Sequence, residues 1–218
     1  MKIFLLLMIT DHQKSSIKNQ KSSIVIILAS KSPRRIELMQ QAGLQFTVQL
    51  SGETDEHYPP ELQREEIPLF LARLKADAFL RTVGIPDNTI VVTADTIVWM
   101  NNQALGKPAD RQEAIDMLKI LSGNMHYVYT GVCLTANHKQ HTFFAESRVF
   151  FRNLTDEEIA FYVDNYHPYD KAGAYGIQEW IGYVGIEKIE GCYYNVVGLP
   201  MEKLYRELCG FVNNEQSP

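Results

Sequence analysis

The chain has 218 residues, of which 45% are hydrophobic and 22% are charged, and its formal net charge is −5. This composition is typical of a soluble globular protein with enough apolar side chains for a full core. The negative charge argues against broad, nonspecific binding of nucleic acid, so any polyanion has to be bound locally. The three cysteines lie far apart without metal-binding spacing, which indicates a reducing compartment and buried thiols.

The sequence predicts one domain over residues 23–212, preceded by a disordered extension at 1–22 and followed by a frayed tail at 213–218. The apolar run Ile3–Ile9 is at the short limit for a signal peptide, and no small-residue cleavage site follows it. The run is also far too short to span a bilayer. A targeting segment is the less favoured alternative, and we expect no membrane partner.

Strands and helices alternate along the first half of the chain. The apolar run 24–29 has the length and β-branched content of a buried strand. Ser32 as N-cap and Pro33 at the first helical position then indicate a helix start. The expected elements are a strand over 24–29, a helix over 33–42, a short strand over 46–50, a helix opening near Ile67, a strand over 89–93 and a hairpin joining 97–100 to 104–105.

The second half combines capped helices with long strands. Asp110 with Glu113, and Thr155 with Glu158, have the spacing of a capping box. Consecutive long strands joined by a polar turn indicate antiparallel pairing, so we predict a mixed α/β sheet rather than a purely doubly wound one. The expected elements are a helix over 110–121, strands over 126–136 and 141–151, a helix over 155–165, a glycine-rich loop over 167–178, a strand over 183–189, a tight connection over 191–198 and a last helix opening at 199–200.

The segment Ser30–Arg35 combines hydroxyls with an unusual placement of charge. Arg34 and Arg35 fall in the first turn of the expected helix, where the helix dipole favours acidic side chains. Two guanidiniums, a hydroxyl and free backbone N–H groups at a strand-to-helix turn can hold a phosphate. The alternative is a pair of solvated arginines on a surface turn.

Carboxylates supply the candidate metal ligands and bases. Asp95 comes directly after the expected buried strand 89–93, where α/β proteins often bind ligands. A carboxylate there can hold a divalent cation or deprotonate water, although a turn or capping aspartate is the alternative. Glu56 and Asp55 lie in an acidic loop that could fold over the same site, but acidic loop residues are mostly just solvated.

Three lysines are the cationic counterparts. Lys107 lies between Gly106 and Pro108 on a rigid turn, which suits contact with a phosphate. Lys75 lies close to an apolar helix face, where it must either extend its charge into solvent or meet an anion. Lys171 precedes a glycine that permits close backbone approach to a ligand.

Taken together, these residues are typical of phosphoanhydride hydrolysis. Cations clustered against a polyphosphate, a metal ion and a carboxylate base are what that reaction requires. The phosphate loop Gly-x-x-x-x-Gly-Lys-Ser/Thr is absent, and no histidines have metal-ligand spacing. Carboxylates rather than imidazoles are therefore expected to hold a divalent cation, Mg²⁺ or Mn²⁺.

The chain resembles the Maf family of nucleoside triphosphate pyrophosphatases over about residues 24–212. Six motifs occur in the family's order. They are Ala29–Arg35, Ala94–Thr96, Leu105–Pro108, Ser122–Gly123 with His126 and Tyr129–Val132, Asp170–Gln178, and Asn195–Pro200. The resemblance implies two lobes around a deep cleft, as in inosine triphosphate pyrophosphatases. It also implies hydrolysis of a nucleoside triphosphate to the monophosphate and pyrophosphate, with a divalent metal, in the cytoplasm, and a homodimer.

The resemblance also implies roles for individual residues. Asp95 resembles the family's proton acceptor, and Glu56 its second essential carboxylate, with Asp55 as the alternative because the loop varies in length. These two carboxylates are the expected metal ligands, and Lys75 and Lys107 are expected to act with them. The other residues at phosphate-contacting or substrate-binding positions are Ser30, Arg34, Arg35, Thr96, Lys171 and Gln178.

The subgroup follows from three positions. The branches that act on dTTP and UTP carry Arg, Thr and Gln there, which match Arg34, Thr96 and Gln178. An amide at Gln178 can donate and accept hydrogen bonds, which suits a pyrimidine edge with both carbonyl and N–H. Glu179 departs from the family, where a glycine is common, and could alter the pocket rim. The alternatives are a pyrophosphatase for modified purine nucleotides such as 7-methyl-GTP, and a non-enzymatic nucleotide-binding regulator of cell division.

Overall fold

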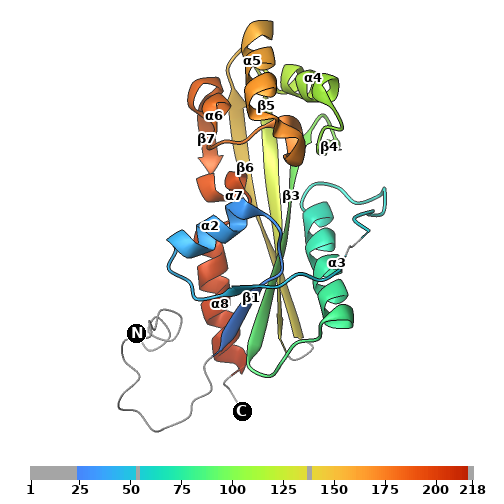
Figure 1. Cartoon of the computed structure of the whole chain (residues 1–218), viewed down its shortest axis with the longest axis vertical. Helices are drawn as coiled ribbons and strands as arrows, with labels where there is room; N and C mark the ends of the chain where they lie inside the picture. The colour runs from blue at the N-terminus through green and yellow to red at the C-terminus, as the bar shows by residue number, and fades with distance from the viewer. Residues whose placement is uncertain (1–23, 53–54, 137–138, 216–218) are drawn as a thin grey trace.

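The computed structural model describes residues 24–52, 55–136 and 139–215, so the predicted extension 1–22 lies outside the described residues. Its core is a seven-stranded mixed sheet with the order β2-β1-β3-β5-β6-β7, and β4 pairs with β3. Figure 1 shows three of these strands, β3, β5 and β6, running along most of the molecule, with helices on both sides. The predicted mixed α/β class is confirmed.

The strands pair in parallel at one end of this order and antiparallel at the other. β1 is parallel to both β2 and β3, whereas β3, β5, β6 and β7 form antiparallel neighbours. Asn101 and Asn102 both have positive φ, as a tight hairpin turn between β3 and β4 requires. The strands are β1 Val25–Leu28, β2 Thr47–Val48, β3 Thr89–Met100, β4 Gln103–Leu105, β5 Met125–Ala136, β6 Lys139–Phe151 and β7 Ile186–Gly191.

The helices begin close to the predicted caps. Thr155 and Glu158 form a complete capping box, and the Asp110 side chain accepts from the backbone N–H of Glu113. None of the described helices is long and apolar enough to cross a membrane. The helices are α2 Pro33–Gln41, α3 Glu66–Thr82, α4 Arg111–Leu121, α5 Asp156–Tyr166, α6 Trp180–Gly185, α7 Tyr193–Val197 and α8 Met201–Glu215, with 3₁₀ turns at Pro168–Asp170 and Ala172–Ala174.

Several local predictions near the C-terminus are wrong. The expected strand 183–189 is divided between α6 and β7, and the expected tight connection 191–198 contains α7. At Gly182 an added Cβ would lie 1.8 Å from the carbonyl oxygen of Ile177, five residues earlier, so only glycine allows the chain to fold back on itself at this helical turn. The last helix continues to Glu215, and residues 216–218 of the predicted tail lie outside the described part.

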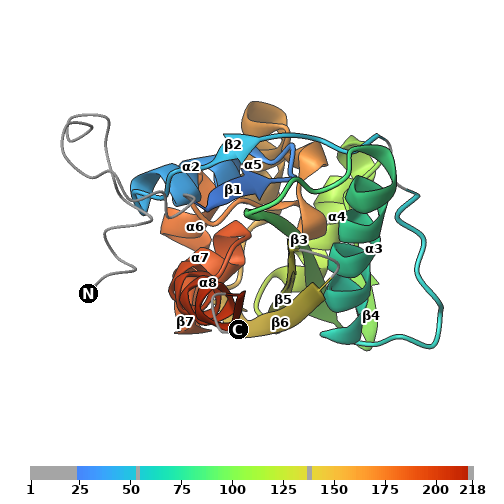
Figure 2. The same cartoon turned by 90° about the horizontal axis from the view of Figure 1, so that it is seen from below.

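Alternate residues of β3 face two different helical layers. Even-numbered residues pack against α2 and α8 at one end and against α4 and α5 at the other, in two separate apolar clusters. Odd-numbered residues pack against α3. Figure 2 shows α8 and α3 on opposite sides of the long strands. Thr96 lies in β3 between the residues of the two clusters on the even face, and Val197 of α7 packs against both clusters.

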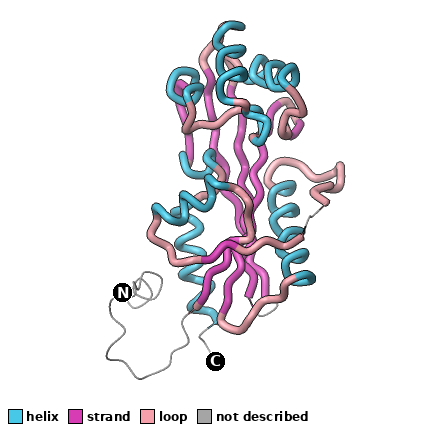
Figure 3. The backbone as a smooth tube through the Cα atoms, in the orientation of Figure 1, coloured by secondary structure: helices cyan, strands magenta, loops and turns pink. Residues whose placement is uncertain are grey.

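One edge of β3 changes partner along its length. β1 pairs with Thr89–Val92 and β4 with Val98–Met100, while residues 93–97 have no strand partner on this edge among the described residues. Figure 3 shows the long loop between β2 and α3, which joins α3 beside this region. The interruption leaves this stretch of a central strand without a neighbouring strand on one edge, and this is where the candidate site lies.

Candidate functional site

A cavity of about 780 Å³ surrounds the interrupted edge of β3. Ten residues that the sequence singled out for catalysis, substrate or metal line it, although they come from six separate stretches of the chain; Asp55, the alternative to Glu56, does not line it. The ten are Ser30, Arg34, Arg35, Glu56, Lys75, Asp95, Thr96, Lys107, Lys171 and Gln178. The structure therefore brings all ten together, and their chemical roles remain predictions. The two-lobe description is likewise still a prediction.

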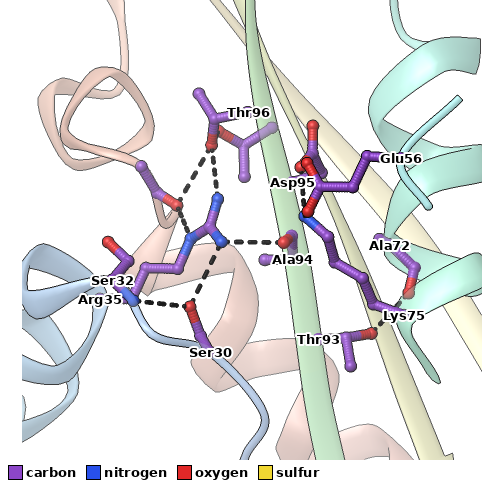
Figure 4. A network of polar contacts seen from close by, with 12 residues as sticks. Ser30, Ser32, Arg35, Glu56, Ala72, Lys75, Thr93, Ala94, Asp95 and Thr96 are labelled. Carbon is purple, nitrogen blue, oxygen red and sulfur yellow. Dashed lines mark hydrogen bonds and ion pairs between the residues drawn. The ribbon is translucent and has the colours of Figure 1, made fainter. Parts of the chain in front are cut away.

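Asp95 lies on the α3 side of β3 and pairs with Lys75. The Lys75 ammonium donates to the Asp95 carboxylate at 2.6 Å and lies 3.0 Å from the Glu56 carboxylate (Figure 4). Asp95 is buried, and it does not follow the strand as predicted, because β3 continues through it and pairs it with Gly131 of β5. The polar triplet 94–96 resembles a strand end in sequence, but its backbone is held by β5.

The second carboxylate at this site is Glu56 rather than its neighbour. Glu56 lines the cavity and reaches Lys75, whereas Asp55 pairs with the exposed ring of His57. The hydrogen bond from His57 lowers the pKa of Asp55, and Asp55 in turn raises the pKa of His57. Of the two residues that the sequence left open, Glu56 is therefore the one at the cavity, and its chemical role remains a prediction.

Two contacts bring α3 close enough for Lys75 to reach Asp95. At Gly131 an added Cβ would lie 2.4 Å from the carbonyl of Pro68, so only glycine allows this approach of α3 to β5. The Thr93 hydroxyl donates to the carbonyl of Ala72 at 2.7 Å and joins the same helix to β3. Lys75 therefore meets anions, which excludes simple extension of its charge into solvent.

Arg35 lies on the opposite, Thr96 side of β3, and its bonds go to neutral oxygens. Its guanidinium donates to the carbonyls of Gly198 at 2.9 Å and Ala94 at 2.8 Å, and to the Thr96 hydroxyl at 3.0 Å (Figure 4). A longer contact of 3.5 Å reaches the Ser30 hydroxyl. Four of the five guanidinium donors are thus engaged. Burial lowers the pKa of Arg35, and the Asp95 charge partly opposes this shift.

The turn before α2 differs in detail from the prediction. Ser32 occupies the N-cap position, but its side chain makes no capping hydrogen bond. Instead the Ser30 hydroxyl accepts from the backbone N–H of Ser32 at 3.2 Å. Ser30 is therefore the residue that orders the turn, while it also contacts Arg35.

Arg34 and Lys171 share a carboxylate that the sequence did not single out. Arg34 donates to one oxygen of Asp170 at 2.9 Å, and Lys171 donates to the other at 2.7 Å. Lys171 also lies 3.1 Å from Glu179. Through Asp170, the two cations join α2 to the loop after α5 at one wall of the cavity. Asp170 and Glu179 reduce the net positive charge of this wall.

A buried polar network supports the Thr96 side. The hydroxyls of Thr96 and Thr130 lie 2.9 Å apart, and Thr130 donates to the backbone carbonyl of Asn195 at 3.2 Å. The fully buried Asn195 side chain donates to the Val128 carbonyl and to Ser147. Asn195 thereby fixes α7, which presents the Gly198 carbonyl to Arg35. Its position within the motif Asn195–Pro200 was the sequence signal for this support.

Two cavity residues keep polar groups available. Lys107 is exposed and has no ion-pair partner among the described residues. The amide oxygen of Gln178 is buried and has no hydrogen-bond partner within the described part of the chain. A buried acceptor without a partner is costly, so a ligand that donates to it would be bound favourably.

The cavity charges favour an anionic ligand. Its lining has three acidic side chains, Glu56, Asp95 and Asp170, against six basic ones. The basic ones are Lys31, Arg34, Arg35, Lys75, Lys107 and Lys171. Across residues 24–52, 55–136 and 139–215, no group of three or more His, Cys, Asp or Glu side chains could hold a metal by itself. A cation here would need ligands from a bound substrate in addition to Asp95 and Glu56.

The thiols differ in their burial. Cys133 is buried, and burial raises its pKa, whereas Cys192 and Cys209 are partly exposed. The expectation of three buried thiols therefore holds for Cys133 alone.

Comparison with known proteins identifies close relatives. A dTTP/UTP pyrophosphatase from Bacteroides fragilis is 56% identical over 183 residues, which are 84% of this chain and 94% of the relative. A relative of the same name from Bacteroides thetaiotaomicron is 52% identical with the same coverage, and one from Flavobacterium johnsoniae is 46% identical over 90% of this chain and 100% of its own length.

A HAM1 protein structure from Coxiella burnetii matches with a TM-score of 0.40 and 14% identity over 59% of this chain and 73% of its own, which is too weak to inform the fold. The family model described as Maf-like protein, in contrast, matches residues 25–211. With relatives that share about half of its residues over more than four fifths of its length, this chain belongs to the Maf family.

Proposed function

We propose that this protein hydrolyses dTTP and UTP to the nucleoside monophosphate and pyrophosphate. Relatives at 46–56% identity carry that activity in their names. The observation that supports it best in the structure is the contact of Lys75 with both Asp95 and Glu56, inside a cavity that has an excess of basic side chains. A carboxylate for water activation next to cations for a polyphosphate is the arrangement that this reaction requires.

In the proposed reaction, water adds across the anhydride bond between the α- and β-phosphates. The water oxygen joins one phosphorus, its proton passes to Asp95, and the anhydride P–O bond breaks to release pyrophosphate. Lys75 is 2.6 Å from Asp95, so it both holds that carboxylate in place and can neutralise charge that develops on the phosphate. The buried position of Asp95 keeps bulk water from competing for its proton.

The donor set fits a divalent cation that is completed by the substrate. Asp95 and Glu56 supply carboxylate oxygens, and Mg²⁺ commonly binds through one or two carboxylates together with substrate phosphates. A bound Mg²⁺ or Mn²⁺ would supply positive charge against the anhydride oxygens. Lys75 contacts both carboxylates, so its ammonium would have to share them or move toward the phosphates.

Arg35 and Lys107 contribute positive charge in different ways. Four donors of Arg35 are bound to protein oxygens, so in this proposal it acts as a fixed charge and a support for the Ala94–Thr96 segment; the phosphate contact that the resemblance implies for it remains a prediction. Lys107 is exposed at the cavity and is available to contact the phosphates directly. Lys171 shares its charge with two carboxylates.

Gln178 is the residue best placed to select the base. Its amide oxygen lacks a partner among the described residues and can accept from the N3–H of uracil or thymine, while the amide nitrogen can donate to a base carbonyl. The other two specificity positions have partners within the protein. Arg34 is bound to Asp170, and the Thr96 hydroxyl is bound to Arg35 and Thr130. They therefore shape the pocket wall through fixed side chains.

A panel of nucleoside triphosphates, with separate detection of pyrophosphate and phosphate, tests this function. We expect pyrophosphate from dTTP and UTP with Mg²⁺ or Mn²⁺, loss of activity with a chelator, and little turnover of GTP. Preferred hydrolysis of 7-methyl-GTP would contradict the assigned specificity. Binding without any turnover would favour a nucleotide-dependent regulator. The same preparation allows measurement of mass in solution, where we expect a homodimer; the proposed location is the cytoplasm.

A further inference from the structure

Gln178 lies in a tight turn that is closed by the next residue. The backbone N–H of Glu179 donates to the carbonyl of Gly176 at 3.0 Å, so Ile177 and Gln178 are the two central residues of the turn. Glu179 is also the N-cap residue of α6, but its side chain makes no capping hydrogen bond. The Glu179 carboxylate is thus used elsewhere.

That carboxylate folds back under the turn. An added Cβ at Gly176 would lie 2.7 Å from the carboxyl carbon of Glu179, so the two residues are in direct contact. The fully buried Tyr162 of α5 donates its hydroxyl to one Glu179 oxygen and accepts from the backbone N–H of Gly176 at 3.0 Å. Burial and the Glu179 charge raise the pKa of Tyr162, which keeps this donor protonated. Gly176, Tyr162 and Glu179 form a closed ring of hydrogen bonds.

The other Glu179 oxygen faces the cavity wall. It lies 3.1 Å from the ammonium of Lys171, which also contacts Asp170 and through it Arg34. The Glu179 side chain is 21% exposed and that of Lys171 only 10%, so this ion pair is well shielded from solvent. The Glu179 carboxylate therefore joins the turn that carries Gln178 to Lys171 and, through Asp170, to Arg34 of α2.

We propose that Glu179 is a positioning residue for nucleotide selection, which holds the Gln178 turn and Lys171 in one fixed arrangement so that base and phosphate are contacted together. This inference rests on the proposed function. A residue without a carboxylate at position 179 would leave both Tyr162 and Lys171 without this partner. Glu179 thus supplies rigidity to a pocket wall without touching the nucleotide.

The test is Glu179→Gln, which keeps the side-chain shape and one acceptor but removes the charge. We expect KM for UTP to rise about tenfold with kcat changed less than about twofold, because ground-state positioning is lost while Asp95 and Lys75 are untouched. The preference for UTP over CTP, which differs at the N3 and C4 positions of the base, should fall about tenfold. Tyr162→Phe should also raise KM. In the double variant, the increase in KM should be smaller than the product of the increases in the two single variants.

Glu207→Gln is the matched control, because Glu207 is 27% exposed, pairs with His141 and lies outside the cavity. The proposal would be overturned if Glu179→Gln kept the KM and the UTP preference of the wild type. It would also be overturned if Glu207→Gln changed both quantities as much as Glu179→Gln does. Amide hydrogen exchange at Gly176 in the nucleotide-free protein separates this inference from the proposed function. If the wild type hydrolyses no nucleotide, faster exchange in Glu179→Gln alone still supports positioning, and unchanged exchange contradicts it.

Discussion

The two sides of β3 at the cavity differ in how they hold charge. On the α3 side, the Lys75 ammonium binds the carboxylates of Asp95 and Glu56 as ion pairs. On the other side, Arg35 is held by two backbone carbonyls and a hydroxyl, and these bind it without neutralising its charge. Adjacent residues of one strand, Asp95 and Thr96, thus belong to two different environments (Figure 4).

This difference indicates a division of labour. Ion pairs between side chains can exchange partners when a phosphate or a metal ion arrives, which suits the reacting groups. A guanidinium whose donors are bound to backbone oxygens is fixed in place, which suits a preorganised positive field. The predictions below test whether chemistry depends on the α3 side and rigidity on the Thr96 side.

The largest effect is expected from Asp95→Asn. The amide cannot accept the proton of the attacking water, so pyrophosphate release from dTTP or UTP should fall about 10³-fold, with thermal unfolding little changed. Asp164→Asn is the control, because that carboxylate pairs with Arg111 outside the cavity. Full activity of Asp95→Asn would contradict the assignment of the base.

Arg35→Lys should lower the free energy of unfolding more than Arg34→Lys does. Lysine keeps the charge but cannot reproduce the four contacts of the guanidinium, so the free energy of unfolding should fall by about 2–3 kcal/mol. Arg34→Lys loses only an ion pair with the exposed Asp170 and should cost less than about 1 kcal/mol. Urea unfolding of the two variants measures the contrast, and equal costs would argue against the supporting role of Arg35.

The buried His126 of β5 makes the stability of the protein depend on pH. Burial lowers the pKa of His126 from 6.5 to about 3, so below pH 6.5 the unfolded chain binds a proton that the folded chain does not. Stability is therefore fully present above pH 6.5 and is lost as the pH falls toward 3, by about 2 kcal/mol between pH 6.5 and 5. His126→Gln should remove this part of the pH dependence in urea unfolding, whereas His141→Gln, at a 44% exposed ring, should not.

A smaller effect is expected at the loop over the α3 side. Glu56→Gln should raise the Mg²⁺ concentration needed for half-maximal activity about tenfold, because one of two carboxylate ligands is lost. Asp55→Asn is the neighbouring control, since Asp55 pairs with His57 and not with Lys75. An equal effect of the two variants would show that the loop acts through its charge rather than through Glu56 itself.

Much of the fold could be predicted because its signals are local. The capping box of Thr155 and Glu158 and the turn at Asn101 and Asn102 depend on a few neighbouring residues, and both form as expected. The continuity of β3 through Asp95 could not be predicted, because it depends on pairing with β5, whose residues lie more than thirty positions away.

The sequence by itself determined which chemistry is available: its motifs contain eight of the ten candidate residues in the cavity, and Glu56 and Lys75 were recognised outside the motifs. Only the tertiary structure decided the partners. It paired Lys75 with Asp95 and Glu56, bound the donors of Arg35 to protein oxygens, and paired Lys171 of the cavity wall with Asp170 and Glu179. The physical reason is that side-chain composition is fixed residue by residue, whereas charge pairing depends on distances that packing sets between segments far apart in the chain.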